Sequence, residues 1–205
     1  MKKQKLIIIS AFFIFVIFIS FYFDSAIVQS VSKIRIGLLT EILMGITFMS
    51  SDIIIFFFLT SLFLWKEHKR RWILPLWFAL GLSVVAGFLL KFSVQRQRPF
   101  QLGLVSVLPI LEKASHEIWN SSFPSFQSML VFCAVPILSK EFPKFKYVWI
   151  SFACLVAFSR IYFGLHFLSD VIAGGLIGYL LGLVIVKAEE RYKLGEKIWK
   201  RIFKK

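Results

Sequence analysis

Cysteine, histidine and linker sequence are all scarce in this chain. Its 205 residues include two cysteines and three histidines. Cys133 and Cys154 fall in apolar runs, where buried small side chains are more typical than a disulfide or a metal pair. A zinc site needs more ligands than these residues supply. No Gly/Ser/Pro-rich linker, charged block or internal repeat divides the chain, so we expect one domain over residues 1–205.

Apolar residues are abundant, at 58% of the chain with 25 phenylalanines, whereas soluble domains contain about 45–50%. A membrane-spanning helix needs about 20 mainly apolar residues. Six runs approach that length: Leu6–Phe23, Ile42–Trp65, Trp72–Leu90, Phe126–Leu138, Tyr147–Phe163 and Val171–Val186. The first run is longer than the apolar part of a signal peptide and precedes no clear cleavage site, so we expect it to be retained. The sequence therefore predicts an all-α integral membrane protein, a bundle of six transmembrane helices.

The formal net charge of +14 comes mostly from four segments that contain 18 of the 25 lysines and arginines. These segments are MKKQK at the start, Lys66–Arg71, Lys140–Lys146 and the residues from Lys187 onward. Six spans place all four segments on one side, which the positive-inside rule makes cytoplasmic, together with both termini. This placement argues against a nucleic-acid partner and favours a multi-pass protein of the plasma membrane.

Two further segments have an interfacial character. The basic tail over residues 188–205 has the spacing of an amphipathic helix, which we expect to lie on anionic lipid headgroups. Residues Ser25–Gly37 are predicted to form a similar segment on the outer face. Asp52 is expected near the start of the true second span, where a carboxylate suits the helix dipole, and we assign it no catalytic role.

Seven cations are left on the predicted outer side, against the positive-inside rule: Lys33, Arg35, Lys91, Arg96, Arg98, Lys113 and Arg160. Four of the seven lie in or beside two short motifs. Lys91 and Arg98 are seven residues apart, which on a helix is two turns and nearly one face. Two cations that face one pocket favour a multiply charged anion, whereas snorkelling at the interface explains one or two such residues but not four.

The segment SRIYFGLHFLSD contains the other motif. His166 and Asp170 are four apart, so on a helix they share a face, and the carboxylate can fix the tautomer of the imidazole. Arg160 can offer a fork of donors to a phosphate. The alternative is an ion pair that only joins two helices, although ionisable groups at membrane depth are usually functional. In SSFPSFQSM, Ser125 is predicted at or near a helix N-cap, where free amides bind phosphate oxygens.

In order and spacing, the three motifs together resemble the signature of the type 2 phosphatidic acid phosphatase superfamily. They are Lys91-x6-Arg98-Pro99, Pro124-Ser125 and Ser159-Arg160-x5-His166-x3-Asp170. That family includes lipid phosphate phosphatases, undecaprenyl-diphosphate phosphatases and vanadium haloperoxidases. The resemblance covers about residues 72–186. It implies metal-independent hydrolysis of a lipid phosphate, without an organic cofactor, at a site that faces the periplasm or the cell exterior.

The resemblance also implies a role for each residue. His166 would attack phosphorus to form a phosphohistidine, and Asp170 would orient it. The phosphate oxygens would be bound by Lys91, Arg98, Ser125, Phe126 with nearby backbone amides, and Arg160. These cations and dipoles are directed at the charge that develops on the equatorial oxygens.

The second motif departs from the family pattern, which usually reads Pro-Ser-Gly-His. Here Phe126 and Gln127 replace the glycine and the histidine, the latter being the usual general acid. Glutamine cannot deliver a proton, and general acid catalysis is typically worth about 10²–10⁴-fold.

Three interpretations follow from this substitution. A diphosphate substrate needs little protonation of its leaving phosphate, which favours a polyprenyl diphosphate such as the undecaprenyl compound. Another acid, with His116 as the candidate, would instead permit phosphatidic acid, phosphatidylglycerol phosphate or lipid A phosphates. The third interpretation is a non-catalytic protein that binds or transports a lipid phosphate. The sequence does not indicate the oligomeric state.

Overall fold

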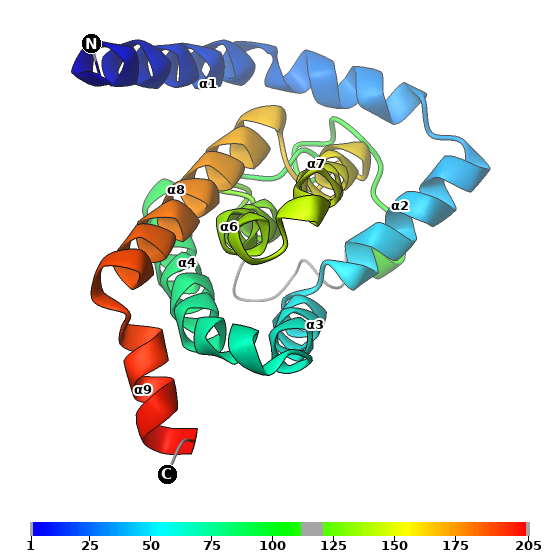
Figure 1. Cartoon of the computed structure of the whole chain (residues 1–205). Helices are drawn as coiled ribbons and strands as arrows, with labels where there is room; N and C mark the ends of the chain where they lie inside the picture. Colours follow the sequence, from blue (N-terminus) through cyan, green and yellow to red (C-terminus); the bar gives the residue numbers. More distant parts are fainter. Residues whose placement is uncertain (1, 112–120, 204–205) are drawn as a thin grey trace.

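The computed structural model describes residues 2–111 and 121–203, and every regular element in those ranges is a helix, which confirms the all-α prediction (Figure 1). The elements in chain order are α1 (Lys2–Lys33), α2 (Gly37–Met49), α3 (Asp52–Leu64), the 3-10 helix η1 (Glu67–Trp72), α4 (Ile73–Val94), α6 (Phe126–Glu141), the 3-10 helix η2 (Pro143–Phe145), α7 (Lys146–Tyr162), α8 (Leu168–Tyr192) and α9 (Leu194–Phe203).

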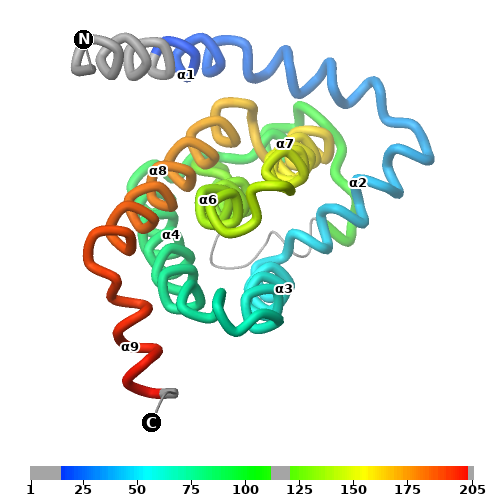
Figure 2. The backbone as a smooth tube through the Cα atoms, in the orientation of Figure 1, coloured from blue at the N-terminus to red at the C-terminus, as the bar shows by residue number. Residues whose placement is uncertain are grey.

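Helix α6 forms the centre of the bundle, with α4, α7 and α8 packed directly against it (Figure 1). Its side chains Leu130, Ala134 and Ile137 are buried in the main apolar cluster, which α3 and α4 complete. Helices α1 and α2 are peripheral: α1 contacts α8 and α7, and α2 contacts α7. The tube in Figure 2 follows this path, from α1 across one side of the molecule through α2 and α3 and back into the bundle. The helices nearest to α6 are therefore those that contain the three motifs.

A stripe of glycines brings α8 against α6. A Cβ atom added to Gly174, Gly178 or Gly182 would lie 2.5, 2.0 or 2.2 Å from a backbone carbonyl oxygen of α6 or of its N-cap. Helices in membranes commonly pack through small residues spaced four apart, because the backbones can then approach closely. The first of these oxygens belongs to Ser125. The stripe therefore sets the distance between the start of α6 and the start of α8.

We expect Gly178→Ala to lower the thermal stability of the protein in detergent, because its Cβ would overlap the carbonyl oxygen of Met129. Overpacking of this kind typically costs about 1–3 kcal/mol. The matched control is Gly81→Ala on α4, where nothing lies within 4 Å of the added Cβ and alanine is the better helix former. Thermal unfolding of the two variants tests the prediction, and equal midpoints would contradict it.

The expected six spans are not confirmed. In the described residues, four helical segments are long and apolar enough to cross a membrane: Phe15–Lys33, Glu67–Val94, Pro143–Tyr162 and Leu168–Tyr192. The predicted helix Ile42–Trp65 is instead two helices, α2 and α3, bent by 69°, and this pair counts as a fifth span only if taken together. The 16 residues of α6 give a length of about 24 Å, short of the hydrocarbon core of about 30 Å.

The bend has a local cause. The Ser50 hydroxyl donates to the carbonyl of Thr47, and Ser51 is the N-cap of α3 in an extended conformation. Serines compete with the helix for backbone hydrogen bonds. Asp52 is the first residue of α3, so its expected place at a helix start is confirmed.

The boundary of the first helix also differs from the prediction. Helix α1 continues to Lys33 and so includes most of the segment predicted as a separate interfacial stretch from Ser25 to Gly37. The extension packs on the bundle, since Val28 is buried in a cluster with Ile161 of α7 and Val171 of α8. No glycine or proline interrupts this part of the helix, and burial of its apolar face stabilises it.

The two ends of the bundle differ in chemistry. At one end Lys69 and Arg71 of η1 pair with Glu141 at 3.7 and 3.8 Å, and Arg71 also pairs with Glu196 of α9 at 3.7 Å. Three of the four predicted cytoplasmic segments therefore lie together. The expected amphipathic tail forms helix α9, with Trp199 packed on the core and Ile198 exposed. Helix α4 begins at this end and has Lys91 in its last turn, at the opposite end.

Candidate active site

Arg160 and His166 are connected by a tight helix-ending turn. At the end of α7, Leu165 N–H donates to the carbonyl of Arg160 at 3.0 Å, and Gly164 N–H donates to that of Ile161 at 2.9 Å. This pair of bonds is a Schellman motif, which requires a left-handed residue at its centre. Gly164 has φ +70°, and a Cβ there would lie 2.3 Å from a methyl of Val105. Glycine is therefore needed at 164 to bring His166 back over the helix end.

His166 lies in this turn and not on the same helix as Asp170, which corrects the shared-face prediction. The imidazole is 1% exposed. Its Nδ1 is 2.7 Å from the backbone carbonyl of Ser122 and 3.9 Å from Oδ2 of Asp170. A carbonyl oxygen can only accept, so Nδ1 carries the hydrogen. The tautomer is thus set by Ser122, and Nε2 is left with the free lone pair that a nucleophile requires.

Asp170 stabilises the surroundings of His166 instead of contacting it closely. Asp170 is the third residue of α8, and its Oδ2 accepts from the Phe167 N–H at 2.8 Å and from the Ser122 hydroxyl. A carboxylate in the first turn that accepts from the N-cap amide is a standard helix-start interaction. Because Ser122 and Phe167 both adjoin His166, Asp170 orients the imidazole through its neighbours.

Three buried cations surround His166. Lys91, Arg98 and Arg160 all act electrostatically on its imidazole. Lys91 donates to the carbonyl of Ser121, and Arg98 donates through Nη1 to the carbonyl of Leu165 at 3.2 Å. Within the described ranges, Nε of Arg160 is buried without a hydrogen-bond partner. A buried donor without a partner is costly, so this atom can gain a bond from an anionic ligand.

The start of α6 completes the site. Ser125 is the N-cap, as predicted, and is fully buried. Its backbone N–H donates to the carbonyl of Asp170 at 3.0 Å, and its hydroxyl bonds Ser128 at 2.9 Å. Phe126 and Gln127 are the first two residues of the helix, whose first amides have no partner within the helix. The dipole of α6 therefore adds positive potential beside His166.

Sequence reasoning missed the role of four residues that bond this site together: Asp24, Ser122, Ser169 and Arg96. Of these, Arg96 was noted only as one of the seven outer-side cations. Arg96 bridges Asp24 and Asp170 with two ion pairs of 2.8 Å each. An aspartate directly after the first apolar run was the available signal, because ionisable residues at membrane depth are rarely incidental. His116, the alternative acid, and Lys113 lie outside the described residues.

Burial, followed by the charges of Arg98, Lys91 and Arg160, holds the pKa of His166 well below its ordinary value of 6.5. Burial also lowers the pKa of Arg98, to about 10, so its guanidinium stays charged at neutral pH. The imidazole is therefore neutral at physiological pH, which a nucleophile requires.

We expect kcat/KM to stay level as pH falls from about 8 to about 6.5 and to decline only well below that, because protonation would inactivate His166 in the nucleophilic role predicted for it from the sequence. The measurement is a pH–rate profile in detergent. The pKa of the substrate phosphate is measured separately by phosphorus NMR, and the profile is corrected for the change in substrate ionisation. An acid limb centred on the ordinary histidine value would contradict the burial effect.

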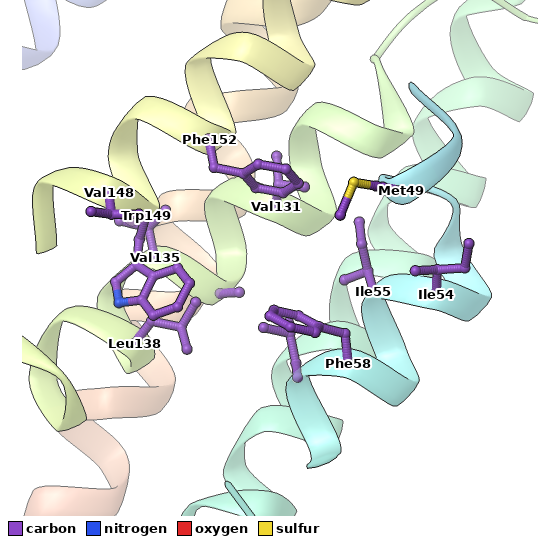
Figure 3. Close-up of a pocket in the computed structure, with 12 residues that line it drawn as sticks. Met49, Ile54, Ile55, Phe58, Val131, Val135, Leu138, Val148, Trp149 and Phe152 are labelled. Carbon is purple, nitrogen blue, oxygen red and sulfur yellow. The ribbon is translucent and has the colours of Figure 1, made fainter. Parts of the chain in front are cut away.

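An apolar pocket of about 240 Å³ lies between α3, α6 and α7 (Figure 3). Phe58 of α3, Val131 of α6 and Phe152 of α7 face one another across it, and Met49 closes it at the bend between α2 and α3. Ile54, which lines the pocket, is two positions after Asp52 in the sequence, and the charge of Asp52 acts on Arg160. Its lining suits a hydrocarbon chain and no polar ligand.

Comparisons with known proteins agree with this geometry. A family model described as the PAP2 superfamily matches residues 72–193. The chain is 28% identical over 185 residues to phosphatidylglycerophosphatase B of Bacillus subtilis, covering 83% of this chain and 85% of that protein. It is 30% identical over 131 residues to an undecaprenyl-diphosphatase of Sulfolobus acidocaldarius, covering 63% and 61% of the two chains.

A similar solved structure is the crystal structure of a transmembrane PAP2-type phosphatidylglycerolphosphate phosphatase from Bacillus subtilis. The two structures align with a TM-score of 0.70 at 25% identity, covering 90% of this chain and 97% of that one. The similarity therefore extends beyond the motifs to α1, α2 and α3.

Proposed function

This chain belongs to the PAP2 superfamily and is a membrane phosphatase, and from that premise we propose that it hydrolyses a polyprenyl diphosphate through a phosphohistidine at His166. The observation that carries the proposal is the bond from Nδ1 of His166 to the carbonyl of Ser122. It leaves Nε2 basic among three cations that suit a phosphate. Lys91, Arg98 and Arg160 bind the phosphate oxygens together with the first amides of α6.

The reaction has two steps. Nε2 attacks the terminal phosphorus, the bond between that phosphorus and the bridging oxygen breaks, polyprenyl monophosphate leaves with the oxygen, and the phosphoryl group passes to the imidazole. Water then attacks the phosphohistidine and releases inorganic phosphate. The cations stabilise charge on the equatorial oxygens in both steps. In our proposal no metal ion takes part.

The substrate class rests on Gln127. A diphosphate expels a phosphate group, which is far less basic than an alkoxide and needs little help from a proton donor. Glutamine can hydrogen-bond the leaving oxygen but cannot protonate it. The apolar pocket between α3, α6 and α7 supports a lipid substrate whose hydrocarbon chain stays in the membrane.

A second candidate is phosphatidylglycerol phosphate, a monoester. It is favoured by the similarity to the phosphatidylglycerophosphatase of Bacillus subtilis, which covers most of both chains. This activity needs another proton donor, for which His116 remains the proposed residue.

Phosphate release by the purified protein in detergent, with EDTA present, tests these proposals. The panel is a polyprenyl diphosphate, phosphatidic acid and phosphatidylglycerol phosphate. We expect the diphosphate to be the best substrate by kcat/KM. A monoester preferred over it would overturn the leaving-group argument, and loss of all activity in EDTA would overturn the metal-independent mechanism.

We also propose that the active site opens on the outer side of the plasma membrane and that both termini are cytoplasmic. The clustering of basic segments at the end of the bundle opposite the site supports this orientation. On that arrangement α9 lies along the cytoplasmic leaflet, where Lys197 and Arg201 attract anionic headgroups.

The position of α9 can be tested with a nitroxide at Ile202→Cys, in a variant with both native cysteines replaced by alanine. In nanodiscs we expect the label to lie deeper when phosphatidylglycerol is present than in phosphatidylcholine alone. Lys197→Gln with Arg201→Gln should abolish the difference. A depth that does not depend on lipid charge would contradict the proposal.

A further inference from the structure

The first helix contributes a buried carboxylate to the site. Asp24 of α1 is 2% exposed and Asp170 of α8 is fully buried. Both pair with the guanidinium of Arg96, through Nη2 and Nη1 respectively, at 2.8 Å each. Asp24 lies within the candidate span Phe15–Lys33, where an ionised side chain is expensive unless it is paired. It also lies outside the residues that match the family model.

Asp24 also binds the start of α8. Its Oδ1 accepts from the Ser169 N–H at 3.0 Å, and its Oδ2 accepts from the Ser169 hydroxyl. Free amides at a helix N-terminus favour a negative charge. Two carboxylates thus bind the first turn of α8, namely Asp170 from within the helix and Asp24 from another helix.

Arg96 is held in one orientation between these carboxylates. Its guanidinium carbon lies 4.0 Å from the ring centre of Phe167 and 4.8 Å from that of Phe21. Contacts of this kind attract a cation to the aromatic face. The backbone carbonyl of Arg96 accepts from the Ser122 N–H at 2.7 Å. Movement of Arg96 would therefore displace Ser122.

Ser122 connects this network of bonds to His166. Its hydroxyl donates to Asp170, its N–H donates to Arg96, and its carbonyl accepts from Nδ1 of His166. An unbroken series of hydrogen bonds and ion pairs thus runs from Asp24 through Arg96, Asp170 and Ser122 to the imidazole. At metal sites, groups that hydrogen-bond a ligating histidine set its ring orientation, and their loss typically costs about 10–100-fold in metal affinity or activity. We expect an effect of the same size for the groups that orient His166.

From these contacts we propose that Asp24 is a positioning residue for His166, so that the first helix is part of the catalytic unit. The proposal rests on the proposed function, in which His166 is the nucleophile. Asp24 acts by fixing Arg96 and the start of α8, which in turn fix the carbonyl that selects the His166 tautomer. It does not touch the phosphate.

The test is a double-mutant cycle with Asp24→Asn and Arg96→Gln in the full-length protein, assayed for kcat and KM on the polyprenyl diphosphate. We expect Asp24→Asn to lower kcat by about 10–100-fold with KM changed less than about threefold, because phosphate binding is intact. In the Arg96→Gln background, Asp24→Asn should have little further effect, because coupled residues are not additive. Asp24→Glu, which keeps the negative charge, should have a kcat between that of Asp24→Asn and that of the wild type.

The control is Ser20→Ala, a buried polar residue one turn earlier on α1 whose hydroxyl donates to the carbonyl of Ile17 in the same helix. It should keep the kcat of the wild type. A drop in kcat equal to that of Asp24→Asn would mean that α1 acts only through general stability. If His166→Asn is inactive while Asp24→Asn keeps full kcat, the positioning role is wrong and the proposed function stands. If His166→Asn stays active, the proposed function itself fails.

Discussion

Replacing His166 with asparagine is expected to lower phosphate release by about 10⁴-fold or more, the scale on which loss of a covalent nucleophile acts. Asparagine suits the test because its amide can still donate to the carbonyl of Ser122, as Nδ1 of the histidine does. The fold and the loop should therefore persist without the nucleophile. The measurement is the rate of phosphate release from a labelled polyprenyl diphosphate.

A second readout addresses the intermediate directly. The substrate is labelled in its terminal phosphate, which is the group that passes to His166. Quenching the wild type in base during turnover should trap this label on the protein, because phosphohistidine survives alkali and is lost in acid. His166→Asn should trap none. The matched control is His68→Asn in η1, at the other end of the bundle, which should keep both rate and label. Residual turnover of His166→Asn near that of the wild type would assign the chemistry to another residue.

The second large effect is expected from Gln127→His. This change restores a proton donor in the first turn of α6, beside Ser125, whose amide bonds the carbonyl of Asp170. We expect kcat on phosphatidic acid to rise by about 10²–10⁴-fold, the usual contribution of a general acid. The diphosphate rate should rise far less, since its leaving group needs little protonation. Comparison of kcat on the two substrates measures the difference.

Equal gains on both substrates would contradict the leaving-group argument. If Gln127→His gives no gain on phosphatidic acid and the wild type already hydrolyses that monoester rapidly, another residue supplies the proton. Loss of this activity in His116→Ala would then identify His116 as that residue. Gln127→Asn serves as the control, because it changes the side chain without adding a proton donor.

The cations that we propose to bind phosphate could be singled out from the sequence because their signal is local. Lys91, Arg98 and Arg160 are cations in or beside apolar runs, on the side that the charge pattern predicts to be the outer one, and the motif spacings are short. The structure brings all three to act on His166. Ser125 could be placed at a helix start for the same reason, since a serine after a proline is a local capping signal.

The connections between the motifs could not be predicted, because they depend on tertiary contacts. The spacing of His166 and Asp170 fits a shared helix face, but Gly164 ends α7 so that the histidine lies in the turn. The carboxylate then bonds Ser122, 48 residues away. Asp24 and Arg96 are 72 residues apart and meet only when α1 packs on α8.

The glycine stripe of α8 separates the spacing of the reaction centre from the shape of the apolar pocket, so selection can change one without the other. Because α6 and α8 meet through bare backbone at Gly174, Gly178 and Gly182, the spacing of the reaction centre is set by atomic radii and not by side-chain choice. The apolar pocket lies on the other side of α6, against α3 and α7. On our proposal that this pocket receives the hydrocarbon chain of the substrate, substitutions there would alter which lipid fits while the reaction centre is unchanged, so one scaffold could evolve new lipid preferences without a new catalytic site.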